Sequence, residues 1–236
     1  MSTLADENEI AVDFFSGSGT AAEAVLRLNR DDNGNRRFVL VQIPEPTENH
    51  EFPTIAEMAK ERIRRVIARM RAGGDDGQLE LDLQPGEDLG FKVFKLAPST
   101  FREWKPPEGE EAQALEEQLT LFDRGLEQGA DPTDVIYEVI LKLGYSLNAR
   151  IEPLAMESNR VCRVTDEAVP ASSSSGAAVP GTSGPSHFFI CLDDHLHHAT
   201  IDALPLDKET AFVCLDTALD DSQKVNLAMQ CLLKVI

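Results

Sequence analysis

The feature that most constrains the fold is the stretch at residues 12–25, VDFFSGSGTAAEAV, where an apolar run meets two glycines one residue apart. Residues 10–15 predict a short buried strand, and residues 21–28 carry Ala, Val and Leu at helical spacing. Glycines at a strand-to-helix turn allow positive φ and let the backbone approach a ligand, while the helix start offers N–H donors. We therefore expect an α/β fold with a small-molecule site at this turn.

The next two elements extend this unit. Residues 38–43, FVLVQI, predict a second strand that is almost wholly apolar, as in a parallel sheet covered on both faces. Residues 54–71 predict the clearest helix, with Thr54 as its cap and a strongly basic outer face. A short strand is expected over residues 90–96.

The remaining residues predict an appended α+β region. Helices are expected over residues 111–128 and 132–143, strands within 150–170, 187–193 and 211–216, and a last helix over 222–235. Residues 171–186 are rich in Ser, Gly and Pro and are expected to form a flexible insertion. We divide the chain into a domain at residues 1–97 and a C-terminal α+β region at residues 98–236.

Charge and cysteine spacing exclude several functional classes. The net charge of −19 over 236 residues opposes non-specific attraction to nucleic acid or an anionic membrane, so any DNA contact needs a local basic patch. No run approaches the roughly 18 apolar residues of a membrane span, and the acidic N-terminus does not resemble a secretory signal, so a cytoplasmic protein without a membrane partner is expected. The four cysteines lack a C-x-x-C pair, which favours free buried thiols over a metal site.

The glycine turn fits neither common nucleotide motif. The dinucleotide fingerprint G-x-G-x-x-G would place a third glycine where Ala22 stands, and a P-loop would need Gly-Lys-Ser/Thr. This weakens the interpretation as a nucleotide-binding oxidoreductase. Residues 13–20, DFFSGSGT, instead contain Phe-x-Gly-x-Gly preceded by an aspartate.

Three segments together resemble one family. DFFSGSGTAAEAVLRLN, GNRRFVLVQIPEP and TIAEMAKERIRRV closely resemble the S-adenosylmethionine-binding segment of the modification (Mod) subunits of type III restriction-modification systems, which are beta-class DNA adenine-N6 methyltransferases. DLGFKVFKL, ADPTDVIYEVILKLGY and FVCLDTALDDSQKVN extend the resemblance more weakly. It implies S-adenosyl-L-methionine as cofactor and a partial Rossmann-like methyltransferase sheet over residues 1–97.

The resemblance also implies which residues hold the cofactor. Its F-x-G-x-G motif, whose turn contacts the methionine portion, matches Phe15, Gly17 and Gly19, and Gln42 stands where relatives often have an acidic ribose-binding residue. An amide accepts through its oxygen but carries no charge, and Glu45 is the alternative carboxylate. The expected cofactor-binding residues are Asp13, Phe15, Ser16, Gly17, Ser18, Gly19, Thr20 and Gln42.

One departure from the family concerns catalysis. Adenine-N6 transfer in this family uses an Asp/Asn/Ser-Pro-Pro-Tyr/Phe motif, which holds the exocyclic amine and stacks on the extruded base. The only Pro-Pro pair lies in KPPEG at residues 105–109, with Lys105 and Glu108 in the two decisive places, so we assign no catalytic residue. In the beta class this motif precedes the glycine motif. We expect the C-terminal portion of a split, truncated or incompletely sequenced subunit, inactive and marginally stable alone.

Two function classes stay open. The first is the cofactor-binding part of a methyltransferase that reaches DNA through the full enzyme. It would work with an N-terminal half carrying the catalytic motif and target-recognition domain, a second Mod subunit and a restriction (Res) subunit. The second is a non-catalytic remnant that holds partner subunits. The arginines of residues 62–71 are expected to form a solvated helix face, and the histidines of residues 195–198 are not expected to bind metal.

Overall fold

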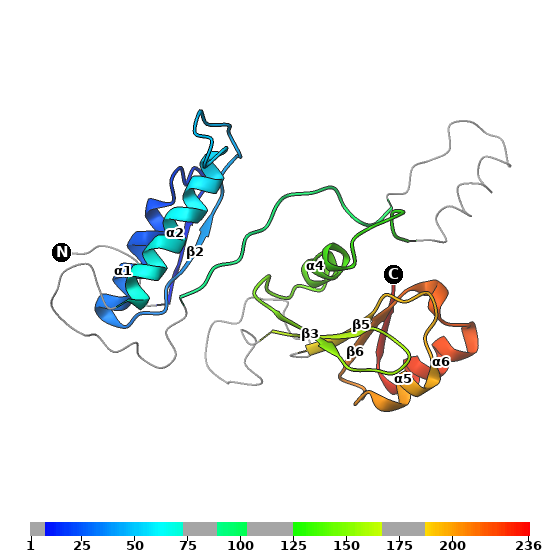
Figure 1. Ribbon diagram of the computed structural model, residues 1–236. Coiled ribbons are helices and arrows are strands. Elements are labelled where there is room, and N and C mark those ends of the chain that lie inside the picture. Colours follow the sequence, from blue (N-terminus) through cyan, green and yellow to red (C-terminus); the bar gives the residue numbers. More distant parts are fainter. Residues whose placement is uncertain (1–7, 73–88, 103–124, 167–186) are drawn as a thin grey trace. The chain divides into compact units, whose positions relative to one another are not determined.

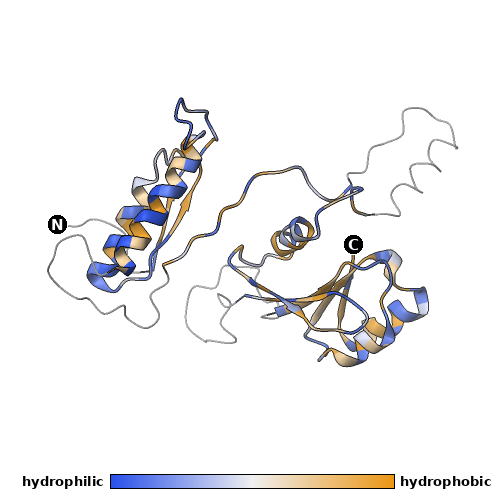
Figure 2. Ribbon diagram, viewed as in Figure 1, coloured by the Kyte–Doolittle hydropathy of each residue, from blue (hydrophilic) through white to orange (hydrophobic). Residues whose placement is uncertain are grey.

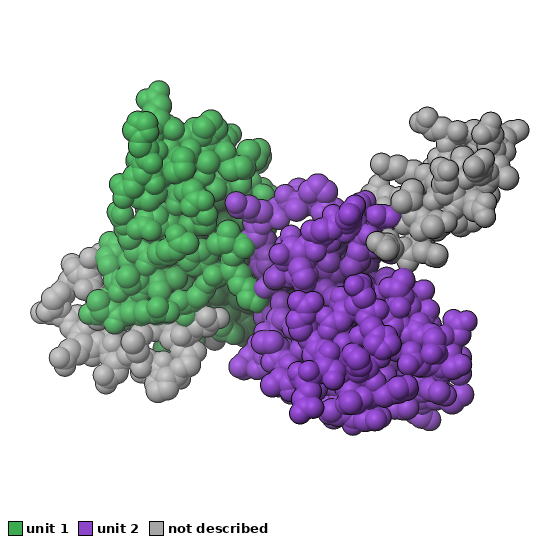
Figure 3. All heavy atoms as spheres, turned by 45° about the vertical axis from the view of Figure 1, so that its right-hand side comes forward, with its two compact units in different colours: residues 1–93 green, residues 94–236 purple. Residues whose placement is uncertain are grey.

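The computed structural model describes residues 8–72, 89–102, 125–166 and 187–236 (Figure 1). The chain separates into two compact units, residues 1–93 and 94–236, which are coloured separately in Figure 3. We describe each unit by itself. The predicted domain boundary between residues 97 and 98 stays a prediction.

The first unit is a parallel strand pair with two helices on one face. Strands β1 (Ile10–Asp13) and β2 (Arg37–Leu40) pair in parallel, with Ile10 opposite Arg37. Helices α1 (Thr20–Asp32) and α2 (Ile55–Arg71) share a core with the inner face of β2. The buried residues of this core are Ala22, Leu26, Ile63, Val66, Ile67, Met70 and Leu89. The predicted strand–turn–helix–strand order is confirmed.

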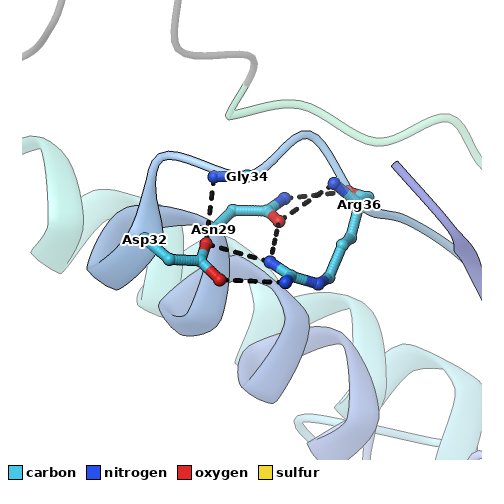
Figure 4. A network of polar contacts seen from close by, with 4 residues as sticks. All are labelled: Asn29, Asp32, Gly34 and Arg36. Carbon is cyan, nitrogen blue, oxygen red and sulfur yellow. Dashed lines mark hydrogen bonds and ion pairs between the residues drawn. The ribbon is translucent and has the colours of Figure 1, made fainter. Parts of the chain in front are cut away.

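Local polar contacts explain where α1 ends. Asn33 adopts a left-handed conformation with φ 56° and is the C-cap of α1. Figure 4 shows how Asn29, Asp32 and Arg36 contact one another across the loop that leads from α1 to β2. The side chain of Asn29 accepts the Arg36 N–H at 2.9 Å and donates to the Arg36 carbonyl at 2.8 Å, while Asp32 pairs with the Arg36 guanidinium at 2.9 Å. These contacts satisfy a buried arginine, whose charge would otherwise be costly.

Helix α2 follows the predicted boundaries. The Thr54 hydroxyl accepts the Glu57 N–H at 3.2 Å, as an N-cap residue should. Its buried residues recur at helical spacing on the side that meets α1. The helix ends at Arg71 with Ala72 as its C-cap, and the Gly73-Gly74 pair predicted to end it lies outside the described residues.

The second unit is a five-stranded sheet between helices. Its strands are β3 (Arg150–Leu154), β4 (Val161–Thr165), β5 (His187–Cys191), β6 (Ala211–Cys214) and β7 (Leu232–Val235). The order is β3-β4-β5-β6-β7, with antiparallel pairing up to β5 and parallel pairing from β5 to β7.

The helices of this unit cover both faces of its sheet. Helix α4 (Pro132–Lys142) packs on one face, and α5 (His198–Ala203) and α6 (Asp221–Gln230) pack on the other. The 3-10 turn η1 (Asp216–Ala218) follows β6. Asp131 caps α4, confirming the predicted helix at 132–143, and Asp220 forms a capping box with Gln223 at the start of α6.

Several element predictions need correction. No strand forms at residues 90–96, where Leu96 is fully exposed and no strand of the described residues pairs with the backbone. The last helix ends at Gln230, because Leu232–Val235 pair with β6 as strand β7. Of the predicted helix at 111–128, residues 111–124 lie outside the described residues, and Leu126 forms a bridge with Phe101 instead. The expected insertion at 171–186 also lies outside them.

The fold class is therefore mixed α/β, as predicted at that level. Two parallel strands do not establish a Rossmann-like sheet, so that architecture stays a prediction. Among the described helices, none is both long and apolar enough to cross a membrane.

Candidate functional site: the glycine turn between β1 and α1

The turn between β1 and α1 has the backbone conformation that its glycines allow. Gly17 and Gly19 have φ of 51° and 78°, the left-handed region that other residues adopt at a cost. The Gly19 N–H donates to the Ser16 carbonyl at 2.8 Å, and Gly19 is the N-cap of α1. The turn thus places the start of α1 beside the end of β1.

The two glycines have different surroundings. A Cβ atom at Gly19 would lie 3.4 Å from the Ala59 Cβ and 3.5 Å from the Ile63 Cδ1, which are ordinary van der Waals distances, so the positive φ is what favours glycine there. A Cβ atom at Gly17 would meet only the Phe15 carbonyl oxygen, at 4.0 Å. The space beside Gly17 is open, which is what a ligand lying against the backbone requires.

The end of β2 reaches this turn through backbone and side chain. The Val41 N–H donates to the Asp13 carbonyl at 2.8 Å, and the Ser16 N–H donates to the Val41 carbonyl at 3.3 Å. The Gln42 Oε1 accepts the Gly17 N–H at 2.7 Å, and its Nε2 donates to the Ile43 carbonyl at 3.0 Å. Ser16, Gly17 and Gln42, predicted as parts of one site, lie together.

Helix α2 contacts the same turn through Arg62. Its Nη1 donates to the Ser18 Oγ at 2.9 Å, and its Nε pairs with Glu23 at 3.0 Å. Burial of Glu23 raises the pKa of its carboxyl, but hydrogen bonds from Arg62 and Arg27 outweigh this and hold the pKa below its ordinary value. The side chain of Arg62, expected on a solvated helix face, is 40% exposed, but sequence reasoning missed its contact with the turn.

The remaining predicted site residues lie around the turn with different exposures. The Asp13 carboxylate accepts the Phe15 N–H at 3.1 Å, which orders the turn locally. Phe15 is 87% exposed, and Thr20 is exposed at the first position of α1. Glu45, the alternative carboxylate, is also exposed, and its N–H donates to the Ile43 carbonyl.

Comparison with known proteins gives one consistent result. No family model matches the chain. It is 38% identical over 101 residues to the type III restriction-modification enzyme StyLTI Mod subunit of Salmonella typhimurium. It is 34% identical over 104 residues to the EcoP15I Mod subunit of Escherichia coli, and 34% identical over 94 residues to the EcoPI Mod subunit of Escherichia phage P1.

About two fifths of this chain resembles type III Mod subunits. The three alignments cover 40%, 42% and 37% of the chain, which confirms the resemblance first noted in its motifs. The chain spans only 14%, 14% and 13% of these Mod subunits. The similarity therefore does not carry the activity of a whole Mod subunit to this chain.

Outside the glycine turn, Asn159 organises a histidine-rich loop of the second unit. Its Nδ2 donates to the Asp193 Oδ2 at 3.1 Å and to the His195 carbonyl at 2.7 Å, and its Oδ1 accepts from the His197 N–H and the Thr200 hydroxyl. This buried amide fixes the loop between β5 and α5. Sequence reasoning missed this role, because a single asparagine between two strands carries no pattern that would indicate it. The described residues contain no group of three or more His, Cys, Asp or Glu side chains that could hold a metal ion.

The four cysteines lie in the second unit and form no disulfide with one another, and all but Cys162 are buried. Cys191 and Cys214 face each other in register on β5 and β6, and Cys231 belongs to the same buried cluster. Burial raises the pKa of the Cys214 thiol to about 12. Such a thiol is an unreactive part of a core rather than a nucleophile.

Proposed function

We propose that this chain is an S-adenosylmethionine-binding portion of a DNA adenine-N6 methyltransferase of a type III restriction-modification system. The open backbone at Gly17, beside the ends of two parallel strands, is the observation that carries this proposal. The similarity to Mod subunits supports it, since it supplies the class of enzyme. Helix N-termini and glycine turns commonly receive small ligands in α/β proteins.

In this proposal the chain binds and orients the cofactor. The Gly17 turn accommodates the methionine portion against the backbone, and Asp13, Ser16 and Ser18 flank it. Gln42 or the nearby Glu45 meets the ribose hydroxyls, while exposed Phe15 and Thr20 line the approach. Bound S-adenosylmethionine would supply an activated methyl group, and orientation is the protein's main contribution to a direct displacement.

Transfer itself is proposed to need a further segment. The 236 residues contain no Asp/Asn/Ser-Pro-Pro-Tyr/Phe sequence, so the chain alone is proposed to be inactive. The amine-binding and base-stacking groups would come from an N-terminal methyltransferase half. DNA, a second Mod subunit and a Res subunit are the proposed partners of the full enzyme.

A second candidate function is a non-catalytic module that holds partner subunits. The β1–β2 pair favours it, because its outer face exposes large apolar side chains. Ile10, Val12, Phe14, Val39, Val41 and Ile43 are between 46% and 68% exposed. An uncovered apolar face of this kind is typical of a surface that a partner covers. In this case the glycine turn would be vestigial.

The test is calorimetric titration of the purified chain with S-adenosylmethionine, with NAD as the ligand control. We expect S-adenosylmethionine to bind and NAD not to bind. Gly17→Asn should weaken binding at least about tenfold, since asparagine tolerates positive φ but fills the open space. Gly144→Asn is the matched control, because Gly144 has φ 80° with no atom near its Cβ position and lies outside the turn.

Each outcome separates the two functions. Binding that is lost in Gly17→Asn and kept in Gly144→Asn would support the cofactor site. Equal binding by both variants would place the ligand elsewhere and refute the site. No binding by an unmodified chain with a folded circular dichroism spectrum would refute cofactor binding by this chain and favour the interaction module.

A further inference from the structure

The side chain of Gln42 joins the two segments that the proposed cofactor site needs. Its Oε1 accepts the Gly17 N–H at 2.7 Å, and its Nε2 donates to the Ile43 carbonyl at 3.0 Å. Gly17 lies 25 residues earlier in the sequence, in the turn between β1 and α1. A single side chain thus connects the glycine turn to the residues after β2.

This bond gives the Gly17 N–H a hydrogen-bond acceptor within the protein. A glycine with positive φ has a wide choice of conformations, so its turn needs contacts that select one of them. The neighbouring bonds from Ser16 and Gly19 are backbone contacts that any sequence could make. The Gln42 Oε1 is a side-chain acceptor for the Gly17 N–H, and its distance of 2.7 Å lies at the short end of the range for N–H···O bonds.

We infer that Gln42 is a positioning residue that holds the glycine turn in its binding conformation through the Gly17 N–H. This inference rests on the proposed function and adds to it, since Gln42 was expected only as a ribose contact. The amide oxygen has two lone pairs, so one accepts the N–H and the other stays available for a hydroxyl. The part of Gln42 that acts on Gly17 is its acceptor oxygen, which a carboxylate at the same position would also supply.

Two substitutions of similar length isolate the acceptor. Gln42→Met keeps a long unbranched side chain and removes the oxygen, whereas Gln42→Glu keeps an acceptor oxygen and removes the donor. Asn29→Ala is the control for general loosening, because Asn29 holds the opposite end of β2 through Arg36. The first measurement, made without ligand, is amide hydrogen exchange at Gly17 by nuclear magnetic resonance. The second is calorimetric titration with S-adenosylmethionine.

We expect Gln42→Met to speed exchange at Gly17 and to weaken S-adenosylmethionine binding, each by about three- to tenfold, the size of one hydrogen bond. Gln42→Glu should restore both to within about threefold of the unmodified chain. Asn29→Ala should leave Gly17 exchange unchanged relative to its neighbours.

Other outcomes would overturn the inference. Unchanged Gly17 exchange in Gln42→Met, with or without weaker binding, would show that Gln42 does not hold the turn. Failure of Gln42→Glu to restore exchange would show that the acceptor oxygen is not the acting group. If exchange follows the expected pattern but even the unmodified chain fails to bind, the positioning role stands and the proposed function fails.

Discussion

The parallel strand pairs β1–β2 and β5–β6 are built from similar apolar runs but are buried very differently. Both pairs contain predominantly hydrophobic strands in Figure 2. In β5 and β6, residues of both faces are buried, with Phe188 and Ile190 in one core and Phe189 and Cys191 in the other. In β2, Phe38 and Leu40 face α1 and α2, whereas Val39 is 48% exposed. An apolar run therefore does not reveal how many of its faces are covered.

The difference arises from where the helices lie. The second unit places α4 on one face of its sheet and α5 with α6 on the other. The first unit places α1 and α2 on the same face. The expectation that residues 38–43 belong to a sheet covered on both faces is thus not met by the described first unit. Two predictions test this comparison, and a third, smaller one tests a polar contact of the second unit.

The largest effect should come from removing a ring that is fully buried in the core between the sheet and α5 with α6. Phe212 on β6 is fully buried, so Phe212→Ala should lower the free energy of unfolding by about 3–5 kcal/mol through lost burial and a cavity. Phe14→Ala, at a side chain 68% exposed, should change it by less than about 0.5 kcal/mol. Urea unfolding followed by circular dichroism measures both. Similar losses for the two variants would break the comparison.

Two valines, one on β6 and one on β2, test directly whether the sheet face on which each lies is covered. Val213 on β6 is 1% exposed and Val39 on β2 is 48% exposed. Val213→Thr buries a hydroxyl without a partner and should cost about 1–3 kcal/mol of unfolding free energy. Val39→Thr should cost less than about 0.5 kcal/mol, because its hydroxyl meets water. An equally large cost at Val39 would mean that its face is covered in solution.

The smallest effect concerns a polar link of the second unit. Burial raises the pKa of Glu138, but hydrogen bonds from Ser99, Thr100 and Lys142 outweigh this and lower it from 4.5 to about 2. The stabilisation is therefore complete above pH 4.5 and is lost as pH falls toward 2. Solvent screening limits it to about 1 kcal/mol.

Glu138→Gln should flatten the pH dependence of unfolding free energy over that interval. The exposed Glu157→Gln variant serves as its control. Urea unfolding at a series of pH values between 4.5 and 2 makes the measurement. An unchanged slope in Glu138→Gln would assign the acid sensitivity to other carboxylates.

The sequence by itself determined the elements whose signals are local. The Thr54 cap, the helical spacing of α2, the helix that begins at residue 132 and the two glycines each rest on signals within a few residues, and the structure has them there. It also determined the likeness to Mod subunits, because that likeness is a similarity of sequence over 94–104 residues.

Only the tertiary structure decided the features that depend on distant partners. The strand β7 forms because β6 offers backbone bonds to residues that also fit a helix pattern, and residues 90–96 find no such neighbour. The contacts of Gln42 with Gly17 and of Arg62 with Ser18 join residues 25 and 44 positions apart. Such contacts cannot be predicted from a single sequence, because local propensity carries no information about which distant residue a side chain will contact in the folded chain.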